Sequence, residues 1–119
     1  MSKFFFPLFI LSLYSCKDFG NPVNLQETTN YTYSNDIQPI FNIHCTSCHY
    51  TNSGLISYES YSKVILNGSV NPEIPEKSSL FYRINLPDEN ILNMPSGNGT
   101  LSTQEIELIE RWMKDGASP

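Results

Sequence analysis

The feature that most constrains this chain is the pentapeptide Cys45-Thr46-Ser47-Cys48-His49. It places two thiols three residues apart and an imidazole directly after the second thiol. A redox-active cysteine pair, a zinc site and a structural disulfide are three chemical uses of such spacing. Each use requires a different context in the rest of the chain, so the surrounding residues decide among them.

The surrounding residues give little support to these three uses. A thioredoxin-like redox pair needs a strand before its first Cys, whereas the apolar residues before Cys45 have helical spacing. A zinc site needs four ligands, typically a second Cys or His pair, and the sequence offers none. A disulfide between Cys45 and Cys48 is possible, but it would close a very small loop and leave His49 without a role.

The same pentapeptide has the C-x-x-C-H form of c-type haem attachment. Two Cys on one helical turn can each form a thioether bond with the porphyrin, and His49 would then lie under the iron as its proximal ligand. Ligation of haem iron by His and Met is typical of cytochromes c. The sequence therefore predicts one covalent haem c on Cys45 and Cys48, with His49 bound to the iron.

The first 15 residues have the composition of a bacterial export signal, with Lys3 followed by an apolar run. This run is shorter than the roughly 20 residues of a transmembrane helix. It ends in Leu13-Tyr14-Ser15-Cys16, which resembles the lipobox of bacterial lipoproteins and implies that Cys16 is acylated. We expect residues 1–15 to be a lipoprotein signal peptide. The protein is then an exported lipoprotein on the periplasmic side of the membrane or at the cell surface.

Residues 16–33 contain Gly20, Pro22 and many polar residues without an apolar period, as expected of the lipidated Cys16 and a flexible tether. Residues 34–119 then form the folded domain. After residue 15 the chain has six Lys and Arg against 12 Asp and Glu. This acidic balance argues against nucleic acid as a partner. The chain is also poor in apolar residues, so we expect something else to help to fill the core.

The second axial ligand follows by elimination. His44 directly precedes Cys45 and cannot reach the opposite face of the porphyrin. Met94 lies in a loop rich in Pro and Gly, which could fold over a flat ring. Met113 lies at helical spacing beside Trp112, as expected of a residue that packs in the core. The sequence therefore predicts Met94 as the distal ligand.

The apolar pattern predicts an all-α domain of four helices. The first is capped by Asn35 or Asp36 and places Ile37, Ile40, Phe41 and Ile43 on one face. The others are expected at residues 58–66, from Ser78 or Ser79 to before Pro87, and from the capping box Ser102–Glu105 to Gly116. The prolines between the helices argue against a sheet.

These residues together resemble class I monohaem cytochrome c domains, especially the small domains of bacterial lipoproteins and planctomycete-type cytochromes c. The resemblance rests on Ile37-Gln38-Pro39-Ile40-Phe41 with the His44–His49 segment, on Met94-Pro95, and on residues 101–117. It implies a small helical domain wrapped around one covalently attached haem c. In that family the residues matching Cys45 and Cys48 carry the thioethers, and those matching His49 and Met94 bind the iron.

The expected function is electron transfer rather than enzymatic catalysis. The protein would be a one-electron carrier, tethered to the membrane through Cys16, whose partners are redox proteins. The alternative is a haem-based sensor, or an electron-transfer subunit of a larger oxidoreductase, with a displaceable sixth ligand. A third interpretation is a structural lipoprotein with a disulfide between Cys45 and Cys48.

Overall fold

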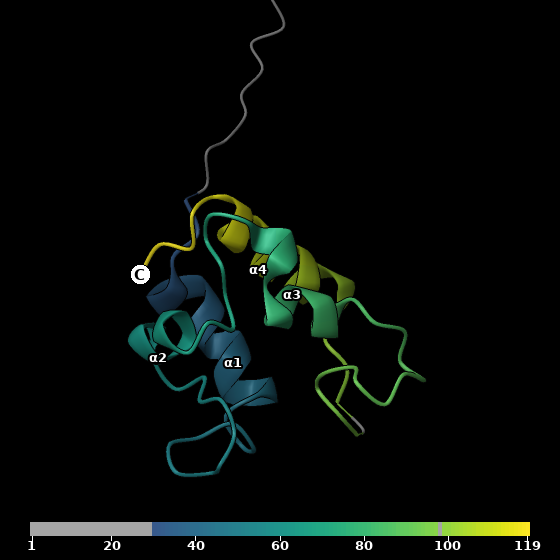
Figure 1. Ribbon diagram of the computed structural model, residues 1–119. Helices are drawn as coiled ribbons and strands as arrows, with labels where there is room; N and C mark the ends of the chain where they lie inside the picture. The colour runs from purple at the N-terminus through teal and green to yellow at the C-terminus, as the bar shows by residue number, and fades with distance from the viewer. Residues whose placement is uncertain (1–29, 98) are drawn as a thin grey trace, which may run out of the picture.

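The computed structural model describes residues 30–97 and 99–119 (Figure 1). The expected signal peptide, Cys16 and the tether up to residue 29 lie outside the described residues. The described part is helical and contains no strand, which confirms the all-α prediction. Its elements are η1 (Tyr33–Ile37), α1 (Gln38–His44), α2 (Tyr61–Leu66), η2 (Pro75–Lys77), α3 (Ser79–Ile84) and α4 (Thr103–Lys114).

The first helical segment begins earlier than the sequence predicted. Thr32, rather than Asn35 or Asp36, is the N-cap of η1, because its hydroxyl accepts a hydrogen bond from the Asn35 amide at 3.3 Å. The Asp36 carboxylate in turn accepts one from the Thr32 amide at 2.8 Å. These two bonds satisfy amides that have no partner at a helix start. The early start brings Tyr33 into the core.

The first and last helices run antiparallel and are tied together at both ends. At one end the Tyr33 amide donates to the Ser118 carbonyl at 2.9 Å. At the other end His44 Nε2 lies 3.0 Å from Glu105 Oε1. The predicted capping box of α4 is present, with Ser102 and Glu105 each bonded to the other's backbone amide.

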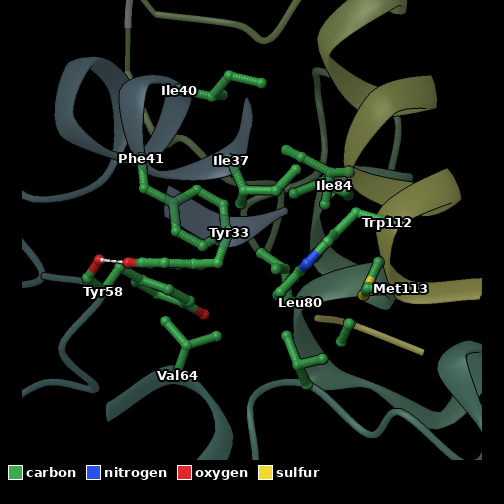
Figure 2. Close-up of a cluster of buried hydrophobic side chains, with 13 residues drawn as sticks. Tyr33, Ile37, Ile40, Phe41, Tyr58, Val64, Leu80, Ile84, Trp112 and Met113 are labelled. Atoms are coloured by element: carbon green, nitrogen blue, oxygen red, sulfur yellow. Dashed lines mark hydrogen bonds between the residues drawn. The ribbon is translucent and has the colours of Figure 1, made fainter. Parts of the chain in front are cut away.

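The core lies between these two helices and α3 (Figure 2). Trp112 and Phe41 are its largest fully buried side chains. Tyr33 packs between them with ring centroids 6.0 Å from Trp112 and 5.9 Å from Phe41. The Tyr33 hydroxyl donates to the Tyr58 carbonyl at 2.8 Å, so the polar tip of this buried ring has a partner.

Two further details differ from the sequence prediction. Helix α2 begins at Tyr61 after the N-cap Ser60, so Tyr58 is buried but precedes the helix. Ile43 was expected on the inner face of the first helix, yet its side chain is 72% exposed. A residue two positions from Phe41 points to the other side of a helix, which explains the exposure of Ile43.

Helix α4, with 12 residues, is the longest described helix. Within residues 30–97 and 99–119, no helix combines the length and apolar character needed to cross a membrane.

Candidate functional site

A cavity of about 380 Å³ lies beside the core and is lined mainly by apolar side chains. Its volume falls within the roughly 300–1,000 Å³ typical of ligand sites. Two loops contribute to its walls: the cysteine loop (residues 45–60) and the methionine loop (residues 85–97). Both loops lie at the end of the domain away from the C-terminus (Figure 1).

All four haem-site residues predicted within the domain line this one cavity. Cys45, Cys48 and His49 come from the cysteine loop, and Met94 comes from the methionine loop. Met94 lies 45 residues beyond His49 in the sequence, so the tertiary fold is what brings these side chains to one place. The fifth predicted site residue, Cys16, lies outside the described residues.

The first turn of the cysteine loop continues the course of α1. The amides of Cys45 and Thr46 both donate to the Phe41 carbonyl, at 2.8 and 2.9 Å. The His49 amide donates to the Cys45 carbonyl at 2.8 Å, which is the four-residue spacing of an α-helical turn. This turn places both thiols and the imidazole along the same wall of the cavity.

The imidazole of His49 is oriented by one backbone carbonyl. Its Nδ1 lies 2.8 Å from the Ile56 oxygen. Because a carbonyl oxygen can only accept, Nδ1 must be the donor, and Nε2 of the neutral ring then carries a lone pair. Among the described residues Nε2 has no hydrogen-bond partner. A second-sphere bond of this kind typically orients a histidine that binds a metal.

The two thiols are free and differ in their surroundings. Cys48 is exposed, whereas Cys45 is partly covered by the core. Burial raises the pKa of the Cys45 thiol to about 12, so this group is a neutral thiol at neutral pH.

The two methionines of the described domain occupy different environments. Met94 is half-buried at the cavity, and its amide donates to the Arg83 carbonyl at 3.2 Å. It precedes Pro95 through a cis peptide bond. Met113 is fully buried in the core cluster that also contains Trp112 and Leu80, and it does not line the cavity (Figure 2).

His44 also lines the cavity, but its ring is bonded to α4. Its Nε2 lies 3.0 Å from Glu105 Oε1. The other oxygen of Glu105 accepts from the Ser102 amide and the Ser102 hydroxyl, both at 2.8 Å. These bonds, the Ser102 amide first, lower the pKa of Glu105. One carboxylate therefore caps α4 and joins it to the end of α1.

A cluster of hydrogen bonds around Glu59 (the Glu59 cluster) closes the cysteine loop and was not recognised from the sequence. Glu59 Oε2 accepts from the Thr51 amide at 2.7 Å, from the Thr51 hydroxyl, from Ser57 Oγ at 3.1 Å and from Lys63 Nζ at 3.2 Å. The bonds from Thr51 are the main reason why the pKa of Glu59 is lowered to about 2. The four-residue spacing of Glu59 and Lys63 was the one signal available in the sequence.

Arg83 was also missed, because nothing in the sequence near α3 points to it. Its side chain lines the cavity, and its Nη1 donates to the Leu92 carbonyl at 3.2 Å. It therefore contacts both the cavity and the methionine loop.

These residues fit a covalently attached haem. The cavity is apolar, two thiols lie one helical turn apart on its wall, and His49 offers a lone pair at Nε2. Met94 offers a thioether sulfur in the same cavity. Within the described part of the chain, no three His, Cys, Asp or Glu side chains are grouped closely enough to hold a bare metal ion.

Comparison with known proteins finds no matching family model, no similar curated protein and no similar solved structure. The functional interpretation therefore depends on the motifs and on the geometry of the cavity.

Proposed function

We propose that this protein is a membrane-tethered, one-electron carrier with one covalently bound haem c. The observation that carries the proposal is that Cys45, Cys48, His49 and Met94 all line one apolar cavity. These are the residue types that attach and ligate haem in cytochromes c. They come from two loops separated by residues 61–84, so the sequence motif alone does not require them to meet.

Each of the four residues has a defined task in this proposal. Cys45 and Cys48 hold the porphyrin through thioether bonds, each formed when a thiol adds across a vinyl group. His49 binds the iron through Nε2 while Ile56 fixes the ring orientation. Met94 closes the sixth position with its sulfur. The bound haem supplies the one-electron chemistry, through the ferric and ferrous states of its iron.

Attachment is tested with the Cys45→Ala/Cys48→Ala double variant. The protein is expressed with a haem c maturation system, denatured and stained for haem on a gel. We expect the wild type to stain and the double variant to lose the stain, because no thioether can form. Equal staining of the two proteins would refute the proposal.

The role of Met94 is tested by Met94→Leu, with Met113→Leu as the matched control. Both changes replace a thioether with an apolar side chain of similar volume, which usually costs less than about 1.5 kcal/mol. Only Met94→Leu should abolish the near-infrared sulfur-to-ferric-iron band, lower the potential and allow carbon monoxide to bind the reduced protein. Rapid binding of carbon monoxide by the wild type would favour the sensor alternative.

The tether is tested separately, at Cys16. Labelling of cells with a radioactive fatty acid should mark the wild type and leave Cys16→Ala unlabelled. The variant should then appear in the soluble fraction or remain unprocessed. Label that persists in Cys16→Ala would remove the lipid anchor from the proposal and leave the carrier function standing.

The acidic charge of the chain bears on the partners of this carrier. Complementary charge accelerates the encounter of two proteins. We therefore propose redox proteins with a basic docking patch as the partners.

A further inference from the structure

The methionine loop has few anchors to the rest of the domain. Most of its hydrogen bonds lie within it, such as those from the Asn93 amide and the Leu92 amide to Asn90. Ile91 is 92% exposed, so burial of this side chain does not hold the loop in place. Most side chains of residues 85–97 are exposed and only Asn93 among them is buried. The loop therefore depends largely on polar contacts to remain over the cavity.

At its start the loop is joined to α3 by Asn85, whose side-chain amide donates to the Phe81 carbonyl at 2.9 Å. Both hydrogen bonds that join the rest of the loop to a helix involve Arg83. Its backbone carbonyl accepts from the Met94 amide at 3.2 Å, and its Nη1 donates to the Leu92 carbonyl at 3.2 Å. Among the described residues, no other hydrogen bond connects residues 86–97 to any element outside the loop. The two bonds act on either side of Asn93, so Arg83 fixes the position of the backbone at Met94.

In the described part of the chain, the side chain of Arg83 makes a hydrogen bond to a carbonyl and no ion pair. No ion pair within the described residues includes Arg83, although Asp88 and Glu89 lie in the loop that it contacts. Its guanidinium donates to a neutral carbonyl instead. A charged donor makes a stronger hydrogen bond than a neutral one, so this contact contributes more than an ordinary loop bond.

We propose that Arg83 is the positioning residue that keeps Met94 at the sixth coordination site. This inference rests on the proposed function, because it requires Met94 to ligate the iron. Loss of the Nη1 bond lets the loop open more often while the backbone bond remains. The sixth position then becomes accessible to small ligands, although every haem-ligating residue is still present.

The inference is tested with Arg83→Gln, Arg83→Lys and the control Arg111→Gln. Arg111 lies on α4 outside the cavity and donates to Asp115 at 3.2 Å. Gln removes the charge and shortens the side chain, whereas Lys keeps the charge and most of the length. All variants should retain covalent haem on a denaturing gel and a wild-type circular dichroism spectrum.

The main measurement is the rate at which the reduced protein binds carbon monoxide. We expect about a tenfold increase for Arg83→Gln, which corresponds to about 1.4 kcal/mol of loop closure, and a smaller increase for Arg83→Lys. Arg111→Gln should match the wild type. The second measurement is amide hydrogen exchange at Met94 and Leu92, which should become faster in Arg83→Gln, because local opening controls exchange.

The outcomes separate this inference from the proposed function. If wild-type protein lacks the sulfur-to-iron band, Met94 is not the ligand and the proposed ligation fails. If the wild type has the band and Arg83→Gln binds carbon monoxide within twofold of the wild-type rate, the positioning role is refuted. A lower potential in Arg83→Gln without faster binding also refutes it, because Arg83 then acts only through its charge.

Discussion

The two loops that flank the cavity are built in different ways. The cysteine loop is hydrogen-bonded along most of its length, through the turn at Cys45, the bond from His49 to Ile56 and the Glu59 cluster. It also ends near Tyr58, which lies in the core. The methionine loop is shaped mainly by its own asparagines and is joined to a helix through Arg83.

This difference indicates that the two loops have different roles at the cavity. The cysteine loop offers a preformed wall on which the thiols and the imidazole have fixed positions. The methionine loop can be displaced locally, because few contacts oppose its opening. Under the proposed function, Met94 is therefore easier to displace from the iron than His49. Three changes test how far the two loops differ in stability.

The largest effect is expected where the cysteine loop meets the core. Tyr33→Phe removes the donor to the Tyr58 carbonyl and leaves a buried acceptor unpaired. We expect the free energy of unfolding to fall by about 1–3 kcal/mol, measured by urea denaturation of protein expressed with the haem c maturation system. Tyr61→Phe is the control, because the Tyr61 hydroxyl makes no hydrogen bond within the described residues. An equal decrease in the free energy of unfolding in both variants would show that the hydrogen bond from Tyr33 does not stabilise the fold.

A smaller effect is expected in the methionine loop. Asn93 is buried, and its side-chain amide donates to the Leu86 carbonyl. Asn93→Ala should lower the free energy of unfolding by about 1 kcal/mol, because water can reach the half-buried Leu86 in place of the lost donor. Amide exchange should accelerate in the methionine loop alone. Faster exchange at His49 as well would mean that the two loops open together.

The smallest effect is expected at Glu59, where it depends on pH. Its pKa is lowered from 4.5 to about 2, so the ionised carboxylate stabilises the fold above about pH 4.5. Most of that contribution is lost as the pH falls from 4.5 to 2. Glu59→Gln should therefore be slightly less stable than the wild type at neutral pH, and the two urea midpoints should converge in acid. A difference as large at pH 2 as at neutral pH would exclude the carboxylate as its source.

Features of the site that depend on local spacing were easier to predict from the sequence than features made by tertiary contacts. The Cys45–His49 motif and the capping box at Ser102 are local, so their spacing is visible in the chain. Arg83 and the residues of the Glu59 cluster are ordinary polar residues whose hydrogen-bond partners are defined only by the tertiary fold. No periodicity distinguishes them from solvated surface residues.

The helix boundaries show the same limit at smaller scale. Asn35 and Asp36 are good capping residues, yet Thr32 caps η1. The earlier start of the helix allows Tyr33 to be buried in the core. Similarly, Tyr58 was assigned to a helix by its spacing and is buried outside it. Tertiary packing determined where both helices begin, and the local sequence pattern does not report on that packing.

The pairing of the two ends of the domain has a practical consequence. Ser118 accepts from the Tyr33 amide and from Trp112 Nε1, and its hydroxyl donates to the Tyr31 carbonyl. Both ends therefore leave the domain at one pole, and the two loops lie at the other (Figure 1). The 12 residues of α4 span about 18 Å between the poles. A protein immobilised on an electrode through either end would thus present the Met94 side of the cavity to the solution, where added reagents can reach it.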